Sequence, residues 1–204
     1  MTVCGHSVIW HTVSAFEKCE DIDKIIVVAR EDEQDFMKSE LSEFDKIHNI
    51  VIGGKTRAES SYKGLRSVPM ECTTVAIHDG ARCLITPEGI SSVLKKAQLY
   101  GAASAAMNVT DTVKRVDDGG NILCTIDRSA LCLVQTPQAF GYRAIMDAFA
   151  SIDILSEEYT DDNAIYERSG GGICTVDIGR DNIKITEPRD ILLAELILKE
   201  RSNV

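Results

Sequence analysis

The sequence predicts an α/β protein in which a mostly parallel sheet carries helices on both faces. Short apolar runs, many of them β-branched, alternate with amphipathic segments along nearly the whole chain, which is the pattern of strands joined by crossover helices. The composition is 44% hydrophobic and 26% charged, as in ordinary globular proteins. A length of 204 residues is enough for one sizeable core. No repeat, linker or low-complexity tract divides the chain, so we expect a single domain.

The first half of the chain is predicted to contain three strands, each preceded by a helix. Ile9, Val13 and Phe16 are spaced i, i+4 and i+7, so we expect a first helix that begins almost at Met1. After it, β-branched runs indicate strands and segments with one apolar face indicate helices. In order, these are a strand at 24–29, a helix at 32–43, a strand at 49–52, a helix from about 57 and a strand at 73–78.

The second half continues this alternation with one interruption. Pro87 directly after Thr86 predicts the start of a helix. Residues 112–128 break the pattern, because two extended pieces flank the sequence Asp118-Gly119-Gly120, as in a hairpin. We expect an arm at about residues 112–130 that leaves the main sheet and reaches another subunit. The remaining elements are a strand at 102–109, a strand at 131–136, a helix from about 142, a strand at 172–178 and a last helix at about 187–200.

Charge and cysteine content exclude several classes of protein. The formal net charge of -10 disfavours nucleic acid as a partner, because an acidic surface repels a phosphate backbone. The seven cysteines include no C-x-x-C pair, so reduced and mostly buried thiols are expected rather than a zinc site or a disulfide framework. The start of the chain lacks the features of a signal peptide and no 18-residue apolar run occurs, so we expect a cytoplasmic protein without a membrane partner.

The stretch "VIGGKTRAES" at 51–60 ends a predicted strand and contains the letters GKT of a phosphate-binding P-loop. A P-loop needs glycine five residues before Gly54, where this chain has Asn49. The stretch therefore does not match the P-loop motif. Two interpretations remain, a tight turn before a helix from about Arg57, or a glycine pair that lets a ligand approach the backbone at a strand end.

Polar and cationic residues follow strand after strand, which supports the ligand interpretation. The carboxyl ends of strands in α/β folds are where ligands bind, and basic residues at these ends suit a phosphate-bearing substrate. The segments concerned are "HDGAR" at 78–82, "TDTVKR" at 110–115, "QTPQ" at 135–138 and "GRDNIK" at 179–184.

Each of these residues also has a purely structural explanation. His78 at a buried strand end is more often a hydrogen-bonded core residue, and Asp79 beside it remains available for a ligand hydroxyl or a substrate-borne Mg²⁺. Thr160 precedes two aspartates that suit the amino-terminal cap of a helix. Arg128 and Lys184 lie in loops beside acidic residues, where most charges are solvated.

Six segments carry a resemblance over nearly the whole chain, from about residue 4 to residue 199. They are "GGKTRAESSYKGL", "HDGAR", "DTVKRV", "TIDRSALCLVQTPQAF", "TDDNAIYE" and "DNIKITEPRDILLAE". In this order they resemble the 2-C-methyl-D-erythritol 4-phosphate cytidylyltransferases of the non-mevalonate isoprenoid pathway. The ribitol-5-phosphate cytidylyltransferases share "TPQ" and "NIKIT", but "HDGAR" and the "DR" before "QTPQAF" are closer to the methylerythritol family.

The resemblance implies a Rossmann-like nucleotidyltransferase domain over residues 1–204 and a reaction in which CTP and methylerythritol phosphate give CDP-methylerythritol and pyrophosphate. The substrate phosphate attacks the α-phosphorus of CTP as an anion, so no general base is required. Alignment and cations would then supply the catalysis. Mg²⁺ would arrive with CTP, and a homodimer would form through the arm.

The resemblance also assigns roles to individual residues. Arg128, on the arm, would reach the neighbouring subunit's site, and Lys184 would approach the reacting phosphates. Gly80 would lie near the ribose. The cytosine contacts would be Gly54, Lys55 and Ser60, and the methylerythritol phosphate pocket would be lined by Asp79, Arg82, Thr112, Thr136 and Thr160.

Three departures from the family pattern are visible. Cys83 replaces a usual proline, and Lys55 stands where some members have an acidic residue. The family opens with a strand and a glycine-rich loop, A-A-G-x-G-x-R followed by P-K-Q, and Met1 aligns after P-K-Q. We therefore expect exposed apolar sheet edges and CTP turnover near zero for these 204 residues. A fragment, a shortened non-catalytic paralogue that binds a ligand or a partner, and a compensating loop remain open as explanations.

Overall fold

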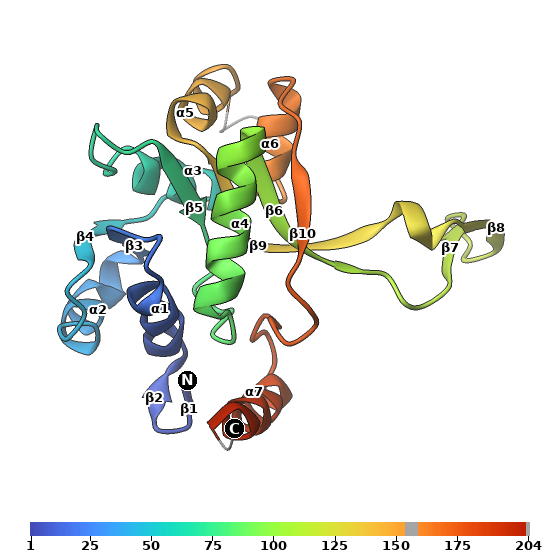
Figure 1. Cartoon of the computed structure of the whole chain (residues 1–204). Helices are drawn as coiled ribbons and strands as arrows, with labels where there is room; N and C mark the ends of the chain where they lie inside the picture. The colour runs from blue at the N-terminus through green and yellow to red at the C-terminus, as the bar shows by residue number, and fades with distance from the viewer. Residues whose placement is uncertain (154–158, 203–204) are drawn as a thin grey trace.

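The main sheet of the computed structural model has the strand order β10-β6-β9-β5 (Figure 1). The structure describes residues 1–153 and 159–202. The strands of this sheet are β5 (Thr74–Ile77), β6 (Ala102–Asn108), β9 (Cys132–Gly141) and β10 (Cys174–Asp177). A separate parallel pair consists of β3 (Ile25–Ala29) and β4 (Ile47–Ile52).

The prediction of a mostly parallel sheet is wrong for the hydrogen-bonded pairs of the main sheet. β10 and β6 are parallel, but β9 runs antiparallel to both β6 and β5. The reason lies in the arm. The chain leaves β6, forms the hairpin of β7 (Val113–Val116) and β8 (Ile122–Ile126), and returns as β9 without a crossover helix. Consecutive strands joined in this way run antiparallel.

Helices cover both faces of the main sheet, as the sequence predicted. On one face, Val93 and Leu94 of α4 (Pro87–Tyr100) and Phe16 of α1 (Val8–Lys18) pack over the alanines of β6. On the other face, Ile145 of α5 (Tyr142–Ala150) and Ile165 of α6 (Asp162–Arg168) form a second core. The small residues of β6 allow the helices to approach closely. The other helices are α2 (Gln34–Glu40), α3 (Arg57–Leu65) and α7 (Pro188–Ser202), with 3₁₀ turns at Glu31–Glu33 and Arg128–Ala130.

The first helix starts later than the apolar spacing predicted. α1 begins at Val8 because Ser7 caps it, accepting a hydrogen bond at Oγ from the Trp10 backbone N–H at 3.2 Å. A small hairpin of β1 (Thr2–Val3) and β2 (His6–Ser7) precedes it. Its turn contains Gly5 at a φ of 90°, a conformation that favours glycine.

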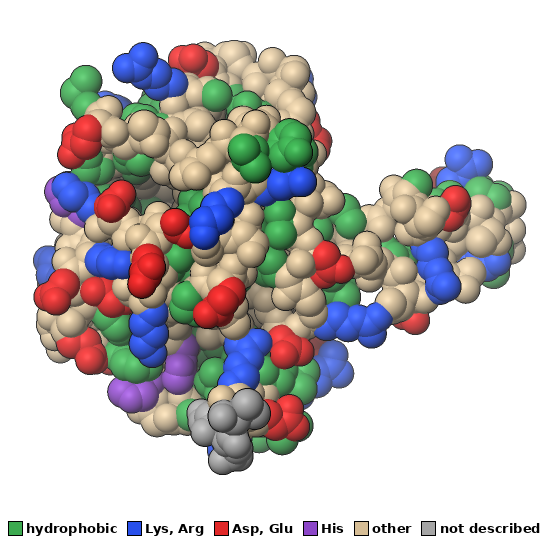
Figure 2. Space-filling view, viewed as in Figure 1, with side chains coloured by type: hydrophobic (Ala, Val, Ile, Leu, Met, Phe, Trp, Pro, Cys, Tyr) green, Lys and Arg blue, Asp and Glu red, His purple; other side chains and the backbone are tan. Residues whose placement is uncertain are grey.

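The predicted arm is present and leaves the body of the protein (Figure 1). Figure 2 shows hydrophobic and basic side chains on its surface. Large apolar side chains are exposed along the arm and on the start of β9, where Leu133 is 53% and Val134 is 43% exposed. No helix among the described residues is long and apolar enough to cross a bilayer. All seven cysteines are free, but only Cys19 and Cys83 are buried, so the prediction of mostly buried thiols is wrong.

Candidate active site

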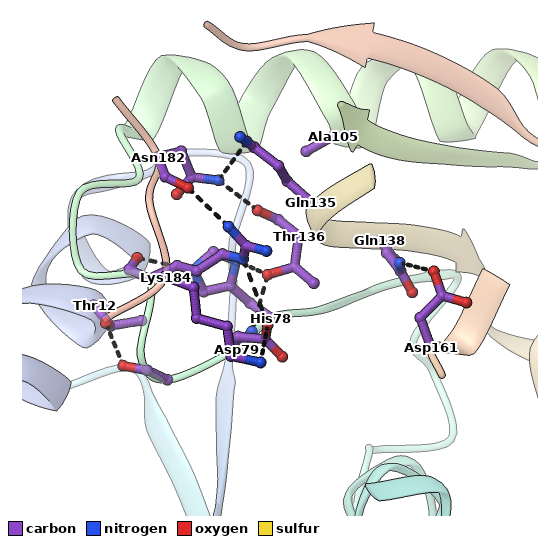
Figure 3. Close-up of polar contacts among 12 residues, drawn as sticks. Thr12, His78, Asp79, Ala105, Gln135, Thr136, Gln138, Asp161, Asn182 and Lys184 are labelled. Atoms are coloured by element: carbon purple, nitrogen blue, oxygen red, sulfur yellow. Dashed lines mark hydrogen bonds and ion pairs between the residues drawn. The ribbon is translucent and has the colours of Figure 1, made fainter. Parts of the chain in front are cut away.

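The carboxyl end of β5 holds a hydrogen-bonded group that joins His78, Asp79 and Arg82 to Thr136 of β9 (Figure 3). The Asp79 backbone N–H donates to Thr136 Oγ1 at 3.0 Å, and the same oxygen lies 3.0 Å from His78 Nδ1. His78 Nε2 lies 3.2 Å from the Arg82 carbonyl oxygen. A neutral ring satisfies both contacts if Nε2–H donates to this carbonyl and Nδ1 accepts from the Thr136 hydroxyl. Burial of the ring lowers the pKa of His78 to about 4, so the imidazole is neutral at pH 7.

Asp79 is the acidic centre of the site and lies between two cations. Lys184 Nζ is 3.1 Å and Arg82 Nε is 3.4 Å from Asp79 Oδ2. Partial burial opposes ionisation of this carboxyl, but the hydrogen bond and charge of Lys184, with the charges of Arg57 and Arg82, lower its pKa overall. Burial also lowers the pKa of Arg82, although Asp79 opposes this effect. Lys184 is 45% exposed at its side chain, so it remains accessible to a ligand.

Asn182 fixes the loop that carries Lys184 against β9. Its Nδ2 donates to the Thr136 carbonyl at 2.9 Å and to Gln135 Oε1 at 3.0 Å, and its own carbonyl accepts from Arg82 Nη1 at 2.9 Å. Figure 3 shows these contacts in one place. The site therefore joins three segments that are far apart in sequence.

Gly80 follows Asp79 at a point where the chain passes close to α1. The Thr12 hydroxyl donates to the Gly80 carbonyl at 2.9 Å. A Cβ at Gly80 would lie 3.0 Å from Ile9 Cδ1, which is closer than side chains normally approach. Thr12 was not singled out from the sequence, because it lies on a helix face with no motif around it.

Gly54, Lys55 and Ser60 form a tight turn at the start of α3. The Gly54 N–H donates to Ser60 Oγ at 3.0 Å, and the Lys55 N–H donates to the Glu59 carboxylate. A Cβ at Gly54 would lie 2.1 Å from Glu59 Cβ, so only glycine fits there. The turn before α3 is therefore present as expected, and a ligand contact at this turn stays a prediction.

A buried ion pair links this turn to α6, and no sequence motif predicts it. Arg57 Nη2 lies 2.7 Å from Asp162 Oδ2, and the Asp162 side chain is 0% exposed. Burial raises the pKa of Asp162 although Arg57 opposes the rise. Asp161 caps α6 by accepting from the Ala164 N–H at 2.9 Å, as predicted, and also accepts from Gln138 Nε2 at 2.8 Å.

Among the described contacts, three residues with predicted roles make no hydrogen bond or ion pair with His78, Asp79 or Lys184. Thr160 is exposed directly before the Asp161 cap. Thr112 is exposed at the base of the arm, and Arg128 on the arm donates to the Thr110 carbonyl. The hairpin of β7 and β8 extends away from β5 (Figure 1).

The arrangement combines oriented cations, hydroxyl groups and a close backbone approach at the carboxyl end of β5 and beside the middle of β9. Among residues 1–153 and 159–202, no group of three or more His, Cys, Asp or Glu side chains is placed to hold a metal ion. Fold and site define an α/β protein with a candidate site at a strand end, which is where proteins of this fold class bind ligands.

The chain belongs to the 2-C-methyl-D-erythritol 4-phosphate cytidylyltransferase family, because the model of that family matches residues 1–200. The enzyme of that name from Caldanaerobacter subterraneus subsp. tengcongensis is 38% identical over 98% of this chain and 89% of its own length. The Alkaliphilus oremlandii enzyme is 39% identical over 95% of this chain and 84% of its own length.

Solved structures agree with the family assignment. The 4-diphosphocytidyl-2C-methyl-D-erythritol synthase of Anaerococcus prevotii has a TM-score of 0.89 at 30% identity, covering 97% of this chain and 88% of that one. The Thermus thermophilus cytidylyltransferase has a TM-score of 0.81 at 26% identity, covering 97% and 92%. The family acts in the non-mevalonate isoprenoid pathway.

Proposed function

We propose that this chain binds 2-C-methyl-D-erythritol 4-phosphate and serves cytidylyl transfer from CTP, which yields CDP-methylerythritol and pyrophosphate. The observation that carries the proposal is the position of Lys184 and Arg82 around Asp79. Asp79 suits the hydroxyl groups of the sugar alcohol as an acceptor. The two cations suit the negative charge of phosphate.

The proposed reaction requires no proton acceptor from the protein. The substrate phosphate is already an anion and attacks the α-phosphorus of CTP, while the bond from that phosphorus to the pyrophosphate oxygen breaks. Lys184 would balance the charge that gathers at the reacting phosphates. His78 is excluded as a general base at this site because both ring nitrogens are engaged by Thr136 and Arg82.

The remaining assigned residues extend the proposal around this centre. Gly54, Lys55 and Ser60 would contact the cytosine, and Gly80 would lie against the ribose. Thr136 and Thr160 would line the sugar phosphate pocket. Thr112 and Arg128, on the arm, would serve the site of a second copy in a homodimer. Mg²⁺ would enter as part of the CTP substrate, since the described carboxylates form no metal cluster.

Calorimetric titration of this chain with methylerythritol phosphate tests the proposal directly. We expect saturable binding at one site per chain, with ribitol 5-phosphate binding more weakly because the relatives act on methylerythritol phosphate. A parallel assay of pyrophosphate release from CTP measures turnover, and release that depends on methylerythritol phosphate supports the transfer step. Absence of methylerythritol phosphate binding would overturn the proposal.

A further inference from the structure

We propose that Asp162 is a positioning residue of this site, because its buried carboxylate holds Arg57 and thereby fixes the turn at 53–60 relative to the main sheet. This role rests on the proposed function, which places the cytosine ring at that turn. Arg57 is the first residue of α3 and directly follows the turn. Its Nη2 lies 2.7 Å from Oδ2 of Asp162, which is the first residue of α6.

The turn needs such an anchor because strand pairing does not place it. It follows β4, which pairs only with β3 among the described strands. Thr136 lies on β9 of the four-stranded sheet, and Asp79 follows β5 of the same sheet. Ala58 and Leu65 of α3 pack against that sheet in an apolar core, but apolar attraction has no preferred direction. An ion pair at the first residue of the helix does have one.

Asp162 can serve as the anchor because the start of α6 is bonded to the main sheet. Gln138 Oε1 of β9 accepts from the backbone N–H groups of Asp162 at 3.0 Å and Asn163 at 3.2 Å. Gln138 Nε2 also donates to the Asp161 carboxylate at 2.8 Å (Figure 3). Asn163 Nδ2 donates to Ser104 Oγ of β6 at 2.9 Å. The Asp162 backbone is therefore fixed to β9 directly and to β6 through its neighbour.

The burial of the ion pair indicates positioning rather than stability. The Asp162 side chain is 0% exposed and the Arg57 side chain is 32% exposed. Taking a carboxylate and a guanidinium out of water offsets most of their attraction, so a buried pair often stabilises a fold no more than apolar side chains would. What the pair supplies is a defined geometry, because the planar guanidinium meets a carboxylate in few orientations.

Asp162 lies where the two halves of the proposed site meet. Thr160, two residues before it, is assigned to the sugar phosphate pocket, and the turn before Arg57 is assigned to the cytosine. Cytidylyl transfer requires both substrates in one alignment, and a misplacement of about 1 Å can lower a rate about a hundredfold. The ion pair sets the separation of these two halves.

The test measures the binding of two ligands separately in the 204-residue chain. Cytidine is the probe for the turn, because it carries no phosphate and a change in its affinity cannot be a lost charge attraction to Arg57. NMR titration of the Gly54 and Lys55 amides measures its Kd, and calorimetry measures the Kd of methylerythritol phosphate. The variant Arg57→Met/Asp162→Leu replaces the ion pair by apolar side chains, which leaves no buried charge without a partner.

We expect this variant to bind cytidine at least about tenfold more weakly, because the turn loses its fixed position. Its affinity for methylerythritol phosphate should change by less than about twofold, because Gln138 still holds α6. Arg57→Lys keeps a cation opposite Asp162 and should recover most of the cytidine affinity. The matched control is Arg66→Met, which removes the same charge at the other end of α3 and should bind both ligands as the parent does.

Equal weakening of both ligands would make the pair purely structural and would overturn the inference, as would an unchanged Kd for cytidine. A parent that binds methylerythritol phosphate but no cytidine at millimolar concentration would also overturn it, and the proposed function would stand. A parent that binds cytidine but no methylerythritol phosphate overturns the proposed function, while the cytidine comparison still decides the role of Asp162. If urea unfolding shows that the apolar variant does not fold, Arg57→Gln/Asp162→Asn gives the same comparison with uncharged amides.

Discussion

His78 is held neutral by its surroundings, and this has a consequence for stability that can be measured. The folded pKa is about 4, whereas the unfolded value is about 6.5. Between these values the unfolded chain binds a proton that the folded chain does not. Stability from this residue is complete above about pH 6.5 and is lost as the pH falls toward 4. Asp79 has a lowered pKa, so its own contribution is lost only at lower pH.

Between pH 7 and pH 4 the parent should lose about 3 kcal/mol of unfolding free energy through protonation of His78 in the unfolded chain. We expect this loss to be absent from His78→Gln. Urea unfolding across this range measures the difference between variant and parent. His48→Gln is the matched control, because His48 is exposed on β4. If the unfolding free energy of His78→Gln and of the parent depended equally on pH, the conclusion that the fold keeps the buried His78 ring neutral would be wrong.

Lys184 is the cation of the site that a ligand can reach most easily. Replacing it by alanine removes one charged hydrogen bond to the substrate phosphate, which is worth about 1.5–3 kcal/mol. We therefore expect Lys184→Ala to bind methylerythritol phosphate about ten- to a hundredfold more weakly. Titration calorimetry measures this, with Lys38→Ala on the surface of α2 as the control. If Lys184→Ala and the parent bound methylerythritol phosphate with equal affinity, Lys184 would not contact the substrate phosphate as proposed.

At the scale of elements, the spacing of apolar residues predicted most helices and strands. It did not predict that β9 pairs antiparallel with β5 and β6. The runs at 24–29 and 73–78 became β3 and β5, because β-branched residues fit a buried pleated surface. The late start of α1 depends on the Ser7 cap, and the direction of β9 depends on where the arm returns the chain. Neither follows from apolar spacing alone.

The candidate site was predictable only where residues followed strands. Asp79 follows β5 and Lys184 follows β10, as predicted. Thr136 lies inside β9, because that strand continues to Gly141, and the structure brings the three residues together. Arg57 and Thr12 lie on helices. There the sequence does not distinguish a polar residue that makes a specific contact from one that is only exposed to solvent. Their roles depend on contacts with Asp162 and Gly80 that only the folded chain creates.

The arm and the adjoining start of β9 predict self-association, because their large apolar side chains are exposed in the described part of the chain. Leu123 and Leu133 are 54% and 53% exposed, and burying a leucine contributes about 1.5–3 kcal/mol. We expect the parent chain to form dimers, and Leu133→Glu to raise the dimer Kd at least about tenfold. Sedimentation equilibrium tests both statements. Leu192→Glu on α7, also exposed at 71%, should leave the dimer unchanged, and a parent that stays monomeric at all concentrations would contradict the prediction.

At the scale of the whole molecule, β3 and β4 form a sheet separate from the four-stranded one. We expect the two sheets to open with different free energies. β3 and β4 share no backbone pairing with the four-stranded sheet among the described strands, and they attach to it through α1 and α3. Val27 and Ala29 bond to β4 only, whereas Ala103 lies between β10 and β9 and is 0% exposed. Elements with few shared contacts open at lower free energy than the core.

We therefore expect the amides of Val27 and Ala29 to exchange at least about tenfold faster than that of Ala103 after correction for intrinsic rates, a difference of at least about 1.4 kcal/mol in opening free energy. Native-state hydrogen exchange in low urea measures these free energies. If the three amides already exchange with one common free energy in the parent chain, the two parts of the sheet unfold as a single unit and the division has no energetic consequence.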